Sequence, residues 1–138
     1  MVKVEIVNGR IIPFPTHNDR TDEGSELTFN GRVRSIEDDK EITHLEYEYY
    51  DGMAEKELRK IAEETIKKYS IHDLFCKHRV GKVEVGQVSL HVVIWSKHRK
   101  EGIDAMTHFI SELKHKVPIW KWAIHQDGTK IPSDCTHQ

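Results

Sequence analysis

The sequence has few cysteines, no long apolar run and no marked excess of either charge. Two cysteines among 138 residues are too few for a disulfide framework, which predicts a protein of the reducing cytoplasm. No apolar stretch approaches the roughly 18 residues that a membrane-spanning helix needs, and the N-terminus lacks the apolar centre of a signal peptide. The net charge of −2 and the lack of a basic stripe interleaved with aromatic residues argue against a nucleic-acid partner.

The composition is that of a soluble globular domain. The chain is 37% hydrophobic and 32% charged, and it is long enough to bury a core. We therefore expect a single domain over residues 1–138. Within it, we expect a hairpin and loop over residues 1–23 and a polar tail over residues 123–138.

The spacing of apolar residues predicts both strands and helices. In chain order, these are a hairpin over 2–12 that turns at Asn8-Gly9, strands over 26–34 and 43–50, a helix over 53–69, two or three strands over 74–80 and 82–95 with a break at Gly86, a helix over about 100–116 and a turn at Asp127-Gly128. Pro118 should end the second helix near Lys116, because proline moves the residue before it out of the α region. The order of strands, helix, strands and helix predicts an α+β fold.

Basic residues gather where strands are expected to end. Arg34 ends the strand over 26–34, and His98 and Arg99 stand between a buried strand and a helix start. An arginine at such a position is suited to a phosphate or carboxylate, and the free N–H groups of a helix start favour an anion. Solvated strand ends are the alternative interpretation, and the pattern alone favours it.

The segment LKHKVPIWKW over residues 113–122 places lysines beside its most apolar residues. Lys114 falls in the last helical turn, and Lys121 falls beyond the bend at Pro118. The two lysines can converge on one pocket, whose wall would be Val117, Ile119 and Trp120. A lysine held there near other cations loses proton affinity and can act in acid–base or nucleophilic chemistry. The alternative is a helix-end lysine beside a lysine that extends past tryptophan to solvent.

The histidines and cysteines do not form a metal-binding pattern. His125, Cys135 and His137 are irregularly spaced in a polar tail, which does not predict a metal site. Cys76 lies among strand-like apolar residues and is expected to be a small core residue.

Four segments occur together in the order of one known family. They are GSELTFNGRVR over 24–34, LEYEYYDGMAEKELRKIAEE over 45–64, HRVGKVEVGQVSLHVVIWSKHR over 78–99 and LKHKVPIWK over 113–121. In these segments the chain resembles the large, catalytic subunit of molybdopterin synthase, the MoaE family. The resemblance implies an α/β hammerhead-like fold with an additional antiparallel β subdomain.

The resemblance also implies partners and a reaction. Members form a homodimer within a heterotetramer, and each protomer receives the Gly-Gly C-terminus of a small ubiquitin-like subunit that carries a thiocarboxylate. Sulfur passes from the thiocarboxylate to cyclic pyranopterin monophosphate, and two such transfers form the dithiolene of molybdopterin. The sulfur donor is a protein tail, so the resemblance implies neither a metal nor a redox cofactor.

The resemblance assigns roles to individual residues. Lys114 matches the family lysine beside the incoming thiocarboxylate, and Lys121 matches the second essential pocket lysine. Three residues match family positions that bind the pterin and its phosphate, with contributions from both protomers: Arg34, His98 and Arg99. Phe29 matches an aromatic position near the channel for the partner's tail.

The tail departs from the family pattern. Trp122 stands where a charge is usual, Ile131 stands in place of a tryptophan, and no arginine follows Arg99. Lys130 is a candidate to replace the tail arginine, although lysine lacks its forked geometry. The alternative function is therefore a non-catalytic relative that binds a ubiquitin-like partner or a phosphorylated ligand.

Overall fold

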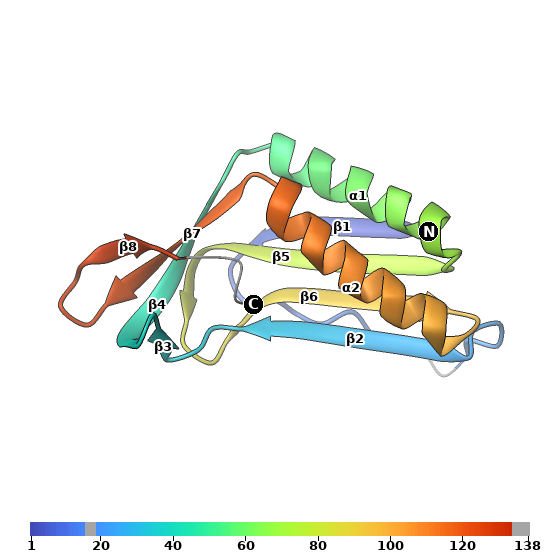
Figure 1. The fold of residues 1–138 in the computed structure, drawn as a ribbon, viewed down its shortest axis with the longest axis horizontal. Helices are drawn as coiled ribbons and strands as arrows, with labels where there is room; N and C mark the ends of the chain where they lie inside the picture. The colour runs from blue at the N-terminus through green and yellow to red at the C-terminus, as the bar shows by residue number, and fades with distance from the viewer. Residues whose placement is uncertain (16–18, 134–138) are drawn as a thin grey trace.

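The computed structural model describes residues 1–15 and 19–133, whose arrangement is shown in Figure 1. In chain order the elements are β1 (Val2–Asn8), β2 (Ser25–Arg32), β3 (Ile36–Glu37), β4 (Lys40–Tyr49), α1 (Met53–Tyr69), β5 (Asp73–Glu84), β6 (Val88–Ser96), α2 (Arg99–Lys116), β7 (Ile119–His125) and β8 (Lys130–Pro132). This confirms the expected α+β fold with an additional antiparallel β subdomain.

Strand β5 belongs to two sheets. Its first part pairs with β6 in antiparallel fashion and with β1 in parallel fashion, and β2 lies on the other side of β6. Its last part, residues 81–84, pairs with β4, which continues through β7 to β8. Gly81 stands where the partners change and has a φ of 81°, which glycine adopts without steric cost. The smaller sheet therefore projects from one end of the larger one (Figure 1).

The two helices lie side by side across one face of the larger sheet (Figure 1). Their apolar residues recur at three- and four-residue steps and so form one buried stripe on each helix. Leu58 of α1 and Phe109 of α2 are fully buried in this core. Beneath them lie apolar side chains of β5 and β6, namely Leu74, Cys76, Leu90, Val92 and Ile94. Cys76 is thus confirmed as a core residue.

Both helices have the bounds that the sequence predicts. Met53 begins α1 after Gly52, and α2 ends at Lys116. Val117 adopts an extended backbone before Pro118, and its N–H still donates to the carbonyl of Leu113 at 3.1 Å. The proline therefore stops the helix in the expected way.

The predicted N-terminal hairpin is wrong. Strand β1 pairs in parallel with β5, and residues 10–15, the described residues after Gly9 on this side of the gap, form no strand beside it. In this position Val4 is buried in the helix-covered core. A two-stranded hairpin would bury far less apolar surface. The burial of β1 beside β5 therefore overrides the turn preference of Asn8-Gly9.

Strand β7 was not predicted, and it takes up the first part of the expected tail. Residues 119–125 pair with β4, so the tail begins only after His125. The expected turn near Asp127-Gly128 is confirmed, since it joins β7 to β8.

The segment between β1 and β2 crosses the face of the larger sheet that the helices leave open. Phe14 packs on Phe75 with ring centroids 5.2 Å apart. The Arg20 guanidinium lies 3.8 Å from the ring centroid of Trp95. These contacts cover the aromatic side chains on that face.

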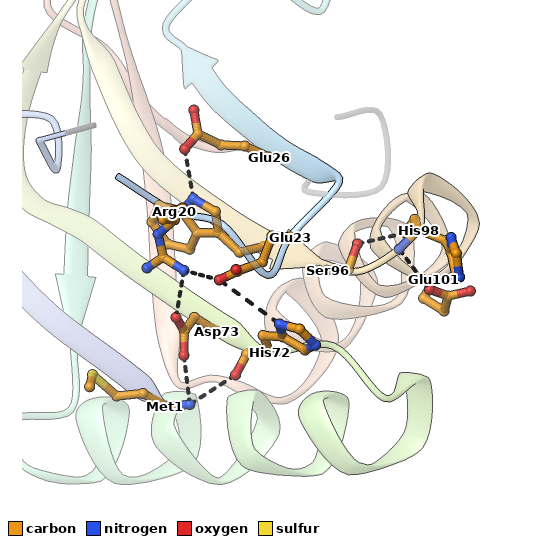
Figure 2. Close-up of polar contacts among 10 residues, drawn as sticks. Met1, Arg20, Glu23, Glu26, His72, Asp73, Ser96, His98 and Glu101 are labelled. Carbon is orange, nitrogen blue, oxygen red and sulfur yellow. Dashed lines mark hydrogen bonds and ion pairs between the residues drawn. The ribbon is translucent and has the colours of Figure 1, made fainter. Parts of the chain in front are cut away.

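Ion pairs fasten the same segment to the start of β5 (Figure 2). Arg20 donates to Asp73 at 2.8 Å and also pairs with Glu23. The second oxygen of Asp73 accepts from the amino group of Met1 at 2.9 Å. Asp73 therefore joins the N-terminus, the crossing segment and the sheet.

Replacing Asp73 with asparagine is expected to destabilise the protein in a pH-dependent way. Burial raises the pKa of Asp73, but the hydrogen bonds and charges of Met1 and Arg20 outweigh it and hold this pKa below its usual value. Such a carboxylate stabilises the fold above its unfolded pKa of about 3.9, and this contribution is lost as the pH falls through the folded pKa. We expect Asp73→Asn to cost about 1–3 kcal/mol at pH 7 and much less at a pH below the folded pKa of Asp73.

Urea unfolding at the two pH values measures this difference. Asp22→Asn, in an exposed position of the same segment, is the matched control and should change little. If Asp73→Asn lowered the free energy of unfolding equally at both pH values, the stabilising role given to the Asp73 carboxylate would be wrong.

Candidate functional site

A cavity of about 310 Å³ opens where the end of α2 meets the junction of the two sheets. Four of the six predicted site residues line it together: Phe29, Arg34, Lys114 and Lys121. They come from β2, the segment after it, α2 and β7. The structure thus brings together residues that are up to 92 positions apart in the sequence.

Two local features direct both lysines to this cavity. Lys114 lies in the last turn of α2, and the extended backbone at Val117 turns the chain into β7 beside β4. Side chains alternate along β7, so Lys121 faces the cavity and Trp120 faces the other way. Lys121 is only 5% exposed, whereas Trp120 is 53% exposed. The lysines therefore share the cavity, but Trp120 does not form its wall.

His78 lines the same cavity and is 5% exposed. Its Nδ1 lies 2.8 Å from the carbonyl oxygen of Arg79, and its ring packs edge-on against Tyr47 with centroids 5.4 Å apart. Burial lowers the pKa of His78 to about 4; the hydrogen bond to Arg79 opposes this shift, and the charges of Lys114 and Lys121 add to it. The imidazole is therefore neutral at physiological pH.

The described residues that line the cavity carry positive charge and no carboxylate. Arg32, Arg34, Lys114 and Lys121 contribute four cations, and the described lining residues include neither aspartate nor glutamate. Glu37 lies just outside, with its Oε1 4.0 Å from Nη2 of Arg34. Guanidinium and ammonium groups held together in this way favour an anionic ligand.

A second cavity lies beside the first and shares its two lysines. It has a volume of about 570 Å³, and Glu48, Val117, Trp120 and Trp122 are among its lining residues. The outward faces of Trp120 and Trp122 thus form a wall for this second space. Lys114 and Lys121 stand between the two cavities.

Lys130 does not take the place of a tail arginine in the first cavity. Its Nζ lies 3.4 Å from Glu46 and 3.2 Å from Glu48, and it lies over the ring of Trp122. The two glutamates alternate along β4 with Tyr47, so they occupy the opposite face of the strand. The carboxylates therefore hold Lys130 away from the cavity lined by Tyr47.

His98 and Arg99 lie at the other end of α2 from the lysines (Figure 1). The N–H of His98 donates to the carboxylate of Glu101 at 3.2 Å, which caps the helix start (Figure 2). At 1.5 Å per residue, Arg99 and Lys114 are about 22 Å apart along the helix axis. One chain therefore does not bring these two residues into the lysine cavity.

His78 and Tyr47 are cavity residues that the sequence pattern did not predict. Strand alternation does place His78 on the face that carries Leu74 and Cys76, so a histidine on an apolar face was a visible signal. The pattern did not reveal what covers that face. Only the packing of α2 and β7 places the imidazole beside two lysines.

Neither a metal centre nor a membrane span is found in the described part of the chain. Over residues 1–15 and 19–133, no group of three or more His, Cys, Asp or Glu side chains is placed to hold a metal ion. Cys135 and His137, considered above with His125, lie outside the described residues. Within the same ranges, neither helix is long and apolar enough to cross a membrane.

The protonation of His78 can be followed by NMR. We expect its Cε1–H resonance to titrate with a midpoint near pH 4, because burial and two ammonium charges disfavour the imidazolium. Lys114→Ala and Lys121→Ala should each raise the midpoint, whereas Lys116→Ala should not, since Lys116 is exposed and paired with Glu112. A wild-type midpoint near the ordinary value of about 6.5 would contradict this geometry.

Known proteins that are similar to this chain point to one family. The family model described as MoaE protein matches residues 12–116. A molybdopterin synthase catalytic subunit of Thermoplasma volcanium is 37% identical over 127 residues, which cover 91% of this chain and 93% of that protein. The crystal structure of molybdopterin synthase from Staphylococcus aureus is similar with a TM-score of 0.79 and 32% identity, over 91% of this chain and 93% of that one.

A further likeness concerns the fold alone. A protein–protein complex of subunits 1 and 2 of molybdopterin-converting factor from Helicobacter pylori contains a chain with a TM-score of 0.72 and 24% identity. That match covers 96% of this chain and 91% of the other. The family model and the T. volcanium relative each cover most of the sequence. The chain belongs to the MoaE family.

Proposed function

We propose that this chain is the catalytic subunit of a molybdopterin synthase. It transfers sulfur from the C-terminal thiocarboxylate of a small ubiquitin-like subunit to cyclic pyranopterin monophosphate, and two transfers form the dithiolene. The observation that carries the proposal is the cavity in which Lys114, Lys121 and Arg34 meet without a carboxylate among the described lining residues. A thiocarboxylate and a cyclic phosphate are both anions, and such a lining attracts both.

The residues that line the cavity have different roles according to their positions. Lys114 and Lys121 stabilise the oxyanion that develops on the carbonyl oxygen of the thiocarboxylate, or they move a proton there, since both stand between the two cavities. Arg34 is largely exposed at the rim, where its guanidinium suits the phosphate. Phe29 contributes an aromatic wall near the path of the partner's tail.

The second cavity fits the tail of the partner subunit. A tail that ends in Gly-Gly has no side chains at its end, so it can enter a narrow space in extended form. Trp120 and Trp122 provide an apolar wall, and the lysines lie at the boundary with the first cavity. In the H. pylori structure, a chain of this fold is part of a protein–protein complex of two subunits.

His98 and Arg99 take part through a second copy of the chain. They lie too far from the lysines of their own chain, and their exposed position at the start of α2 leaves them accessible to another protomer. In a two-fold symmetric homodimer, each chain would give these residues to the site of its partner. Two small subunits would complete a heterotetramer.

Under this proposal, residues 1–138 form one domain that acts in the cytoplasm. The alternative is a non-catalytic relative that binds the same partner or a phosphorylated ligand, and the altered tail is the observation that favours it. Lys130, engaged by Glu46 and Glu48, supplies no replacement for the tail arginine.

Reconstitution tests the catalytic role of the lysines. The chain is mixed with a thiocarboxylated partner subunit and cyclic pyranopterin monophosphate, and the dithiolene product is measured. We expect Lys114→Ala and Lys121→Ala each to lower the turnover rate by roughly 100-fold, because each removes a charge from the reacting centre. Lys116→Ala is the matched control and should keep the wild-type rate.

Two outcomes would count against the proposal. A wild-type chain that binds both ligands and forms no product would favour the non-catalytic alternative. A Lys114→Ala variant as active as wild type would remove the role given to that lysine.

Mixing two inactive variants tests the shared site. Lys114→Ala and Arg99→Ala chains are refolded together, so that a mixed dimer contains one intact site and one doubly altered site. Random pairing of the two variants predicts recovery of about a quarter of the wild-type activity in a two-fold dimer. Without recovery, Arg99 would have no role in the partner's site.

A further inference from the structure

We propose that His78 is the proton acceptor of this site: its Nε2 takes a proton from the water that releases the partner's tail from the transferred sulfur. The inference rests on the proposed function and adds a residue to it. It is carried by the position of the imidazole in the first cavity, by its fixed tautomer and by the chemistry of its neighbours.

The hydrogen bond at Nδ1 fixes the tautomer. Nδ1 lies 2.8 Å from the carbonyl oxygen of Arg79, and a carbonyl can only accept, so Nδ1 carries the hydrogen. In the neutral ring, Nε2 then carries the lone pair. The edge-on contact with Tyr47 at 5.4 Å, with an interplanar angle of 76°, restricts rotation of the ring. His78 therefore presents a basic nitrogen in a defined orientation.

The other lining side chains are poor proton acceptors. The lysines and arginines are donors in their charged forms, and arginine does not give up its proton in proteins. The hydroxyl groups of Tyr47 and Ser89 and the amide of Asn30 do not take up a proton near neutral pH. With no carboxylate among the described lining residues, the imidazole is the group there suited to act as a base.

The step needs such a base. After sulfur transfer, the carbonyl carbon of the tail is joined to the sulfur on the pterin as a thioester. Water attacks this carbon, the carbon–sulfur bond breaks with its electron pair left on sulfur, and the tail departs as a carboxylic acid. Nε2 of His78 accepts one proton of the water, and the second is lost when the acid ionises. The step consumes one water and neither an oxidant nor a reductant.

The surrounding charges couple this role to substrate binding. His78 is faced by Lys114 from α2, Lys121 from β7 and the phenol ring of Tyr47 from β4, while Arg32 and Arg34 line the same cavity. Burial and the two lysine charges keep the imidazole neutral. An anionic ligand offsets the same charges, so the basicity of His78 rises when the site is filled.

Two substitutions separate the role of Nε2 from that of Nδ1. His78→Asn keeps an N–H group near the position of Nδ1, where it can donate to Arg79, and removes Nε2. His78→Gln places an amide, which is not basic, near the position of Nε2. His44→Asn is the matched control, because His44 lies on β4 outside both cavities and contacts Glu46.

The variants are tested with the thiocarboxylated partner and cyclic pyranopterin monophosphate. Product is measured, and the covalent adduct of tail and pterin is followed by intact-protein mass spectrometry. We expect both His78 variants to bind partner and substrate as wild type does, to accumulate the adduct and to release it at least about 100-fold more slowly. The release rate of wild type should fall in acid as the imidazole becomes protonated, and that of the variants should lose this dependence. His44→Asn should behave as wild type.

Three results would overturn the proposal. One is release by His78→Asn within about threefold of wild type, without accumulated adduct. Another is loss of partner binding in both His78 variants, which would show a structural role. A wild-type chain that forms neither adduct nor product would overturn the proposed function itself and this inference with it, whereas the first two results leave that function standing.

Discussion

The change of pairing partner along β5 is the constraint on which the rest of the structure depends. Up to residue 80 the strand is held between β1 and β6 beneath the helices, and from Gly81 it pairs with β4. Since β7 is attached to β4, the point at which β5 leaves the larger sheet decides where Lys121 stands relative to the end of α2. His78 lies just before this point. The cavity is thus formed by the junction of the sheets.

Under the proposed function, the charges in the cavity serve catalysis more than stability. Lys121 is almost fully buried, and His78 is kept neutral beside two ammonium groups, an arrangement that adds little to stability. Proteins accept such local conflicts at functional sites, where donors fixed in advance need not reorganise during reaction. The apolar core between the helices and the larger sheet, centred on residues such as Phe109 and Leu58, supplies the compensating stability.

Under the proposed function, the two ends of α2 belong to two different functional surfaces. Lys114 at one end stands at the cavity, and His98 and Arg99 at the other end are exposed. A single helix keeps these groups apart at a fixed distance. Under the proposed function, this separation explains why a site would need two protomers: a symmetric pair brings the start of one α2 to the cavity of the other chain.

The sequence by itself determined the features that depend on neighbouring residues. Apolar spacing defined both helices, Pro118 ended α2 at Lys116, and the order of motifs identified the lysines at 114 and 121. The tertiary structure decided what depends on distant residues. It paired β1 with β5 in place of a local hairpin, made residues 119–125 a strand, and placed His78 with Lys114 and Lys121. Strand pairing and the faces that become buried depend on packing over the whole chain. A local sequence pattern does not show which distant surface will cover it.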